Sequence, residues 1–246
     1  MIFFKVEAQS NKFILESSKY IDNKLKNSTI QWIFKANYRL LTPSQSLYSS
    51  PYGIFYFCFM KRIAIFASGS GTNAENLVKY FRDHHGICCA LLVCDNKNAL
   101  VFERMRKYGI QSVLISKNDL INGEVEKILK HHNIDFIVLA GFLKLIPVSL
   151  IEKFPNSIIN IHPSLLPKFG GKGMYGMKVH EAVVNAGETE SGITIHYVNE
   201  KFDEGKIIAQ YKFGISGEDT SQSIALKIHD LEMKWLPVEV EKLLMS

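Results

Sequence analysis

Short apolar runs alternate with longer amphipathic stretches from Met60 to the end of the chain. The apolar runs predict strands at 61–67, 87–93, 111–115, 135–140, 157–161, 191–198 and 206–213. Helical spacing of apolar residues predicts helices at about 73–83, 99–108, 119–132, 147–154, 176–186 and 219–244, the last open to a bend at Pro237. This alternation indicates an α/β fold: an open, mostly parallel twisted sheet with helices on both faces, Rossmann-like, closed by a long C-terminal helix.

Residues 1–59 show no sustained helical or strand period. They are rich in Phe, Tyr, Asn, Ser and Lys and end in an aromatic run at 53–59. The apolar core of a secretory signal should lie near the start, and a transit peptide should be rich in Arg and poor in acids; neither pattern is present. We therefore predict an N-terminal extension, 1–59, outside the native catalytic fold, and a catalytic domain, 60–246, with Met60 as the working start. A small accessory domain is the alternative for 1–59.

The net charge of +5 is unevenly distributed. Residues 1–59 hold seven Lys or Arg and three acids, a net charge of +4, which leaves +1 for 60–246. A nearly neutral main body argues against a nucleic-acid partner. No apolar run is long enough to span a bilayer, and the four cysteines lack zinc-ligand spacing. We expect reduced cysteines in a cytoplasmic protein, with no membrane partner and no metal site.

A glycine-rich turn, residues 68–73 (Ser-Gly-Ser-Gly-Thr-Asn), directly follows the first strand of the catalytic domain and opens the first helix. Glycines permit close backbone approach, and a helix N-terminus offers free N–H groups to a phosphate. Residues 69–74 also fit the dinucleotide pattern G-x-G-x-x-A, with Asp95 after the second strand. The turn therefore predicts a phosphate site, and alone it favours a nucleotide-binding dehydrogenase equally well.

Two further segments carry polar side chains suited to chemistry. Asn160 and His162 are two residues apart at the end of a strand, so they project on the same side. An amide and an imidazole can stabilise charge on a carbonyl oxygen and transfer a proton. Asp203, in an acidic turn after the strand 191–198, could orient His162, although on this segment alone a turn residue is the better interpretation. His196 shares a strand face with Thr194 and is expected to be a structural hydrogen-bonding residue.

In combination these segments resemble the folate-dependent formyltransferases, in particular those acting on glycinamide ribonucleotide. The resemblance covers nearly all of 60–246 in one collinear order. The matching segments are 68–73, 95–99 (Asp-Asn-Lys-Asn-Ala), 138–142 (Val-Leu-Ala-Gly-Phe), 160–167 (Asn-Ile-His-Pro-Ser-Leu-Leu-Pro), 171–176 (Gly-Lys-Gly-Met-Tyr-Gly) and 202–205 (Phe-Asp-Glu-Gly). The segment 160–167 with the later Asp-x-Gly is the most specific part of the set.

The resemblance implies that the amine of phosphoribosylglycinamide attacks the formyl carbon of 10-formyltetrahydrofolate, in de novo purine biosynthesis. Asn160, His162 and Asp203 would form the catalytic trio, with Asn160 and protonated His162 on the oxyanion. The phosphate end of the substrate would contact Gly71, Thr72 and Asn73, and the last helix would supply His229, Asp230, Leu231 and Glu232. Glu232 would hold the amine, so Asn73 and Glu232 are expected at opposite ends of the substrate.

The resemblance also implies a wall for the folate co-substrate, partly made of backbone groups. Its expected members are Leu143, Lys144, Leu145, Ile146, Asn160, Asn199, Glu200, Lys201, Phe202 and Asp203. No metal is implied, and a homodimer is left open.

Four other functions compete with this interpretation. Formyltetrahydrofolate deformylase shares the trio, but it should carry a regulatory domain before the catalytic one and lack the phosphate turn. Methionyl-transfer-RNA formyltransferase should continue beyond residue 246 into a basic RNA-binding domain. An NAD-dependent dehydrogenase rests on 69–74 and Asp95. A nonenzymatic nucleotide-binding module leaves the trio unexplained.

Overall fold

The computed structural model describes residues 4–9, 12–17, 45–49 and 55–246, with side chains from Met60 onward. Along the chain it divides into two compact units, and the boundary follows Lys61. No helix among the described residues is long and apolar enough to cross a membrane.

The first unit contains a four-stranded sheet in the order β2-β1-β4-β3, in which all three pairings are antiparallel. Its strands are β1 (Phe4–Gln9), β2 (Lys12–Ser17), β3 (Gln45–Ser49) and β4 (Phe55–Phe59). The sequence had shown no strand period here, so these strands correct that expectation. The aromatic run 55–59 is β4, and aromatic residues favour extended backbone even where alternation with polar residues is missing.

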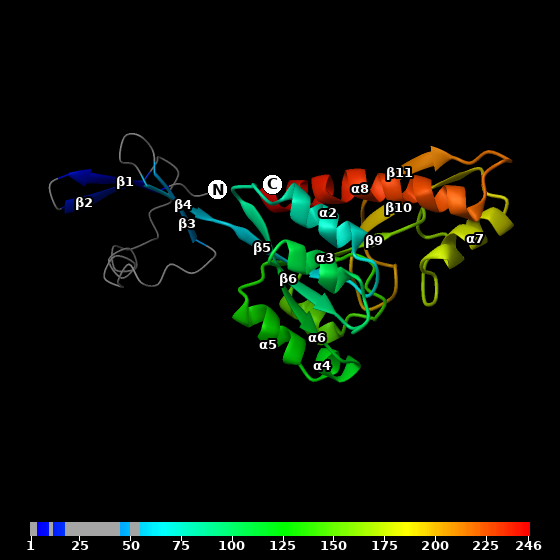
Figure 1. Cartoon of the computed structure of the whole chain (residues 1–246), viewed down its shortest axis with the longest axis horizontal. Helices are drawn as coiled ribbons and strands as arrows, with labels where there is room; N and C mark the ends of the chain where they lie inside the picture. Colours follow the sequence, from blue (N-terminus) through cyan, green and yellow to red (C-terminus); the bar gives the residue numbers. More distant parts are fainter. Residues whose placement is uncertain (1–3, 10–11, 18–44, 50–54) are drawn as a thin grey trace. The chain divides into compact units, whose positions relative to one another are not determined.

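The second unit is built on a seven-stranded sheet in the order β11-β10-β9-β8-β5-β6-β7 (Figure 1). Its strands are β5 (Lys61–Phe66), β6 (Ile87–Cys94), β7 (Gln111–Leu114), β8 (Phe136–Leu139), β9 (Ile158–His162), β10 (Glu190–Tyr197) and β11 (Ile207–Gly214). β5 and β8, β8 and β9, and β6 and β7 pair in parallel, whereas β10 is antiparallel to β9 and β11. The predicted α/β class with a mostly parallel sheet is confirmed.

Helices cover both faces of this sheet. They are α2 (Thr72–Tyr80), α3 (Val101–Lys107), α4 (Lys117–Ile121), α5 (Glu124–His131), α6 (Val148–Lys153), α7 (Met177–Asn185) and α8 (Ser221–Met245). On β5, Ile63 and Ile65 join a core with residues of α2, α3, α7 and α8, whereas Ala64 and Phe66 join a second core with α4, α5 and α6. Strand side chains alternate between faces, so one buried strand supplies both cores.

Two helical segments show how local chemistry sets the boundaries. The single helix predicted at 119–132 is two helices, because Gly123 adopts a left-handed conformation (φ 82°) between α4 and α5. Ser116 caps α4 by accepting a hydrogen bond from the Asp119 amide. α8 continues through Pro237 as one helix, with Leu236 and Pro237 buried.

The order of the strands determines where a ligand can bind. From β5 the chain proceeds outward to β6 and β7, and then returns to the other side of β5 with β8. In open α/β sheets such a reversal leaves a crevice beyond the carboxyl ends of the adjacent strands. The glycine-rich turn after β5, the loop after β8 and the polar end of β9 all lie at that edge.

Candidate active site

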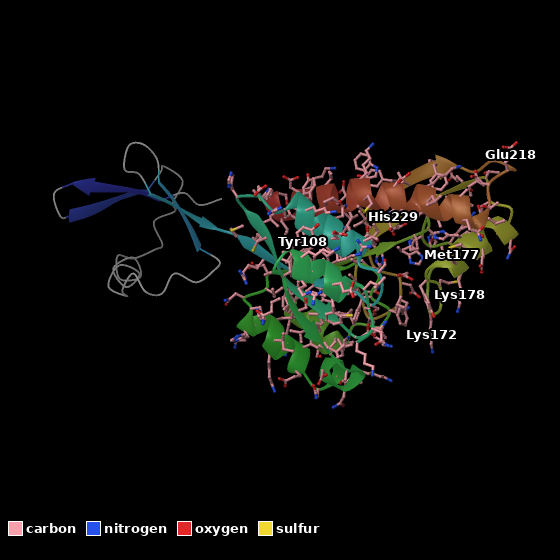
Figure 2. The ribbon with its side chains drawn as sticks, in the orientation of Figure 1. Tyr108, Lys172, Met177, Lys178, Glu218 and His229 are labelled. Carbon is pink, nitrogen blue, oxygen red and sulfur yellow. The ribbon has the colours of Figure 1, made fainter. Side chains whose placement is uncertain are left out.

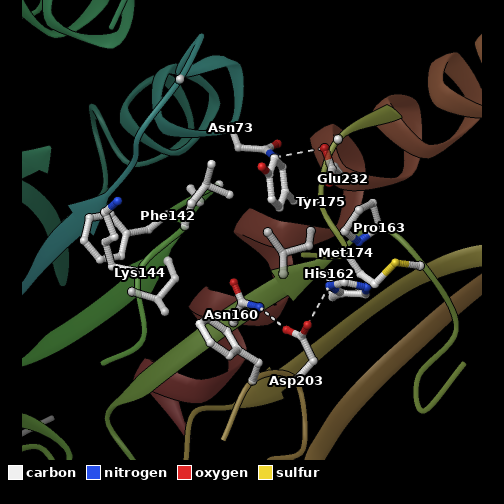
Figure 3. A pocket seen from close by; sticks show the side chains of 18 of the residues that line it. Asn73, Phe142, Lys144, Asn160, His162, Pro163, Met174, Tyr175, Asp203 and Glu232 are labelled. Carbon is white, nitrogen blue, oxygen red and sulfur yellow. Dashed lines mark hydrogen bonds and ion pairs between the residues drawn. The ribbon is translucent and has the colours of Figure 1, made fainter. Parts of the chain in front are cut away.

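A cavity of about 670 Å³ lies at this edge of the sheet (Figure 3). It brings together most of the residues that the sequence had singled out. Its lining includes Gly71, Thr72, Asn73, Leu143, Lys144, Leu145, Ile146, Asn160, His162, Asn199, Lys201, Phe202, Asp203, His229 and Glu232. Three expected members, Glu200, Asp230 and Leu231, are not among the lining residues.

The three residues predicted to be catalytic form one connected group. Asp203 Oδ2 lies 3.4 Å from His162 Nδ1, and Asp203 Oδ1 accepts a hydrogen bond of 3.2 Å from Asn160 Nδ2. Asn160 and His162 project from the same face at the end of β9, and Asp203 reaches them from the turn after β10 (Figure 3). The structure thus brings together an amide, an imidazole and a carboxylate that are far apart in sequence.

Both ring nitrogens of His162 face acceptors. Nε2 lies 2.8 Å from the Phe169 carbonyl oxygen, and Nδ1 faces the Asp203 carboxylate. The side chain is nearly fully buried. These two contacts hold the imidazole in a fixed orientation.

The charge on Asp203 has identifiable causes. Burial alone would raise the pKa of this carboxyl, but hydrogen bonds with His162 and His196 and the Gly171 amide outweigh burial and hold the pKa well below its usual range. Gly171 donates to Oδ2 at 2.9 Å. Asp203 is therefore a carboxylate that can stabilise a cationic imidazole.

His196 belongs to the same group, although the sequence indicated only a structural role. Its Nε2 lies 3.1 Å from Asn160 Nδ2 and 3.6 Å from Asp203 Oδ1. The sequence contained no direct signal, because the contact depends on the pairing of His196 with Asn160 across β10 and β9. The Asn160 amide thus donates one hydrogen bond to Asp203 and lies within hydrogen-bond distance of His196 Nε2. A substrate oxyanion in the cavity would compete with these partners for the amide.

The glycine-rich turn has the geometry of an anion-binding site. Gly71 is the N-cap of α2 with a left-handed backbone (φ 76°), and a Cβ atom there would lie 2.4 Å from Val101 Cγ2. Arg104 braces the turn by donating from Nε to the Ser70 carbonyl at 2.8 Å and by pairing with Glu75. The free N–H groups at the start of α2 therefore border the cavity.

Asn73 and Glu232 are in direct contact, which corrects the expectation that they lie at opposite ends of a substrate. Asn73 Nδ2 donates to Glu232 Oε2 at 2.9 Å (Figure 3). The other amide atom, Asn73 Oδ1, is buried without a partner. A carboxylate and an unpaired carbonyl oxygen side by side offer acceptors to an N–H donor, which an amine or amide supplies.

Asp95 is not available to a dinucleotide ribose. Its Oδ1 accepts from Ser68 Oγ at 2.6 Å, and its Oδ2 lies 3.5 Å from Lys144 Nζ. Both oxygens are therefore engaged, and the side chain is largely buried. These contacts argue against Asp95 as the ribose ligand that a dinucleotide-binding pattern requires after the second strand.

The loop after β8 borders the cavity, but not all of its backbone is free. The Leu143 amide donates to Ser68 Oγ at 3.2 Å, so it is not an unpaired donor for a ligand. Leu143 and Leu145 are each 44% exposed, whereas Ile146 is buried. The loop presents apolar side chains that suit a flat ring.

Among the lining residues that were not singled out as site residues are Met174, Tyr175 and His180. Met174 and Tyr175 lie in the matched segment 171–176, on the cavity side (Figure 3). His180, on α7, is buried with no partner for Nδ1, and burial lowers its pKa. Figure 2 labels Lys172, Met177 and Lys178 in and beside α7, and His229 on α8.

No group of three or more His, Cys, Asp or Glu residues in the described part of the chain could hold a metal ion.

Comparison with known proteins supplies the family. The family model described as formyl transferase matches residues 61–240. The phosphoribosylglycinamide formyltransferase of Bacillus subtilis is 39% identical over 191 residues, covering 75% of this chain and 95% of that protein. The chloroplastic phosphoribosylglycinamide formyltransferase of Arabidopsis thaliana is 41% identical over 194 residues, covering 73% of this chain. The chain spans 64% of the length of that plant relative.

A solved structure supports the same relationship. The crystal structure of phosphoribosylglycinamide formyltransferase from Bacillus halodurans superimposes with a TM-score of 0.69 and 38% identity, covering 76% of this chain and 96% of that one. Fold and site define an α/β protein in which a glycine-rich turn at a helix N-terminus and the group Asn160, His162 and Asp203 line one cavity. The chain belongs to the formyl transferase family.

Proposed function

We propose that this protein transfers the formyl group of 10-formyltetrahydrofolate to the amine of phosphoribosylglycinamide, a step of purine biosynthesis. The observation that carries the proposal is that Asn160, His162 and Asp203 share one cavity with a phosphate turn and with Glu232. Relatives with the same printed activity cover most of this chain.

The ribonucleotide would bind between the glycine-rich turn and α8. The N–H groups around Gly71 and Thr72 receive the phosphate, because a helix N-terminus stabilises an anion. Asn73 and Glu232 together receive the glycine amine through the acceptors described above. His229, also on the cavity wall, completes the α8 side.

The folate would occupy the side of the cavity formed by 143–146 and 199–203. The amine attacks the formyl carbon, and negative charge develops on the formyl oxygen. Protonated His162 stabilises that charge, joined by the Asn160 amide. Asp203 keeps His162 protonated and assists removal of the proton from the attacking amine. Collapse of the tetrahedral intermediate breaks the bond between the formyl carbon and the folate nitrogen. That nitrogen takes up a proton, which balances the proton lost by the amine, and tetrahydrofolate is released.

In this proposal the folate is a co-substrate rather than a resident cofactor, and this chain's chemistry is carried by side chains and backbone. The cytoplasmic location and the homodimer stay predictions.

A single assay separates transfer from its nearest alternative. The full chain is mixed with 10-formyltetrahydrofolate, with and without phosphoribosylglycinamide, and folate absorbance is followed. We expect a signal that requires the ribonucleotide. A signal of equal rate without it would indicate deformylation and overturn the proposal, as would tight NAD binding with no turnover.

A further inference from the structure

Ser68 connects two parts of the cavity that the proposed function assigns to different substrates. It is the first residue of the glycine-rich turn, after β5. Its hydroxyl Oγ accepts a hydrogen bond of 3.2 Å from the amide of Leu143, in the loop after β8. The Ser68 amide also donates to the Gly141 carbonyl oxygen at 3.0 Å. The ribonucleotide turn is thus bonded directly to the folate loop at two points.

Asp95 determines the orientation of the Ser68 hydroxyl. The hydroxyl proton points to Asp95 Oδ1 at 2.6 Å, so its lone pairs are left to accept from Leu143. The other carboxylate oxygen of Asp95 lies 3.5 Å from Lys144 Nζ, on the folate loop. Asn96 Nδ2 donates to the Ser68 carbonyl at 3.2 Å. The segments that follow β6 and β8 are therefore both hydrogen-bonded to Ser68, which itself follows β5 and whose side chain is buried.

Such a bridge matters for a reaction between two bound molecules. The reacting atoms must come within about 3–3.5 Å, and a displacement of about 1 Å can cost roughly a hundredfold in rate. The turn and the loop belong to neighbouring strands, but each is an irregular segment beyond the regular ladder. Their separation is fixed by the Ser68 contacts rather than by the sheet alone.

We propose that Ser68 is a positioning residue that holds the ribonucleotide turn against the folate loop, and that it makes binding of either substrate favour binding of the other. The inference rests on the proposed function. Ser68 itself need not touch either substrate. Asp95 acts one step further away, by orienting the Ser68 hydroxyl.

Ser68→Ala tests this inference, with Ser149→Ala as its control. Ser149 Oγ donates to buried Glu126 at 2.9 Å, with Lys153 Nζ 3.9 Å from the same oxygen, so it repeats the Ser–carboxylate–Lys arrangement away from the cavity. We expect Ser68→Ala to raise KM for both substrates and to lower kcat about tenfold or more. Ser149→Ala should keep wild-type kinetics. A rise in KM for only one of the two substrates would overturn the proposal, as would kinetics equal to those of Ser149→Ala.

Binding supplies a second measurement that is independent of turnover. The Kd of phosphoribosylglycinamide is measured by calorimetry with and without tetrahydrofolate. The wild type should bind it more tightly with tetrahydrofolate present, and Ser68→Ala should lose most of that difference. Asp95→Asn keeps an acceptor for the hydroxyl and should retain the difference. If tetrahydrofolate changed the Kd of phosphoribosylglycinamide equally in Ser68→Ala and in the wild type, the proposed coupling between the two substrates would be wrong.

The design separates this inference from the function on which it rests. A wild type without transfer activity refutes the proposed function, whereas an active wild type with an unaffected Ser68→Ala refutes only the bridge. If Ser68→Ala does not fold, Asp95→Ala replaces it. In that variant Ser68 is present, but its hydroxyl has lost the carboxylate that orients it. We expect the same rise in KM for both substrates and the same fall in kcat.

Discussion

In the proposed reaction, His162 is the residue on which most of the chemistry depends. Its two ring nitrogens face the Phe169 carbonyl and the Asp203 carboxylate, so groups of the protein itself fix the orientation of the ring. Phe169 lies two residues before Gly171, whose amide donates a hydrogen bond to Asp203. The orientation of the imidazole and the charge of its partner therefore depend on the same short stretch of chain.

Removing either charged member should lower turnover while folate binding survives. His162→Ala and Asp203→Ala are each expected to reduce kcat roughly a hundred- to a thousandfold, the usual effect of losing a group that stabilises a developing charge. Because the two side chains act as one unit, the double variant should be much less impaired than the product of the single effects. Steady-state kinetics and folate titration measure both quantities. Near-normal turnover in His162→Ala would refute the catalytic assignment.

Asp203 should also make stability depend on pH. Its folded-state pKa is depressed, so its contribution is fully present above the unfolded pKa, about 3.9, and is lost as pH falls through the folded value. The Tm of Asp203→Asn should lie below that of the wild type at about pH 7, and the gap should narrow toward about pH 3. Thermal unfolding at constant ionic strength measures the gap. A gap that stays constant or widens in acid would contradict this reading of the carboxylate.

Asn73 and Glu232 should affect the ribonucleotide and not the folate. Asn73→Ala and Glu232→Ala are expected to raise KM for phosphoribosylglycinamide with little change in the folate constant. Since the two side chains are hydrogen-bonded, their effects should not be additive. A double-mutant cycle on kcat/KM tests this coupling. If the KM for the folate changed instead, the assignment of Asn73 and Glu232 to the ribonucleotide would be wrong.

At the residue scale, sequence reasoning found groups that carry their own local signal. Asn160 and His162 are two residues apart on a strand, so their common face follows from strand geometry. Contacts made across the fold had no such signal. The Asn73–Glu232 bond joins α2 to α8, and the approach of His196 to Asp203 depends on the pairing of β10 with β9.

At the scale of elements, apolar periodicity predicted every strand of the second unit, with boundaries that differ by at most one residue at either end. Buried parallel strands form nearly continuous apolar runs, which is a strong signal. The break at Gly123 was missed because one glycine inside a helical pattern is usually tolerated. In 1–59, β1 does alternate apolar and polar residues, but this six-residue signal was overlooked among the irregular, Asn-, Ser- and Lys-rich stretches around it.

The junction of β5 and α2 can be tested with two glycines of the same turn. Gly71 has a left-handed backbone and no room for a Cβ, whereas a Cβ at Gly69 would meet nothing within 4 Å. Gly71→Ala should lower the free energy of unfolding by about 1–3 kcal/mol, since it forces Val101 to move and strains the backbone. Gly69→Ala should change it far less. Urea unfolding of both variants provides the comparison, and equal losses would contradict the steric argument.

At the scale of the whole molecule, described lining residues of the cavity fall between Gly69 and Glu232, and the family match covers 61–240. The strand order places the cavity where the sheet reverses direction, with β5 at its centre. Lining residues from α2, the β8 loop, β9 and α8 therefore converge only when the complete second unit is folded. A partial unit that lacks the central strand should bind neither substrate.

A chain that starts at Met60 should retain transfer activity and the fold of the second unit. The lining residues that the structure describes all lie in the second unit, and a compact unit with its own cores can fold independently. Deletion of 1–66 is the matched control, because it also removes β5, on which both cores are built. We expect native circular dichroism and near-wild-type kcat/KM for the first deletion, and loss of the cooperative unfolding transition for the second. If the Met60 chain keeps its circular dichroism spectrum but loses activity, residues 1–59 contribute to function and the predicted division of the chain is wrong.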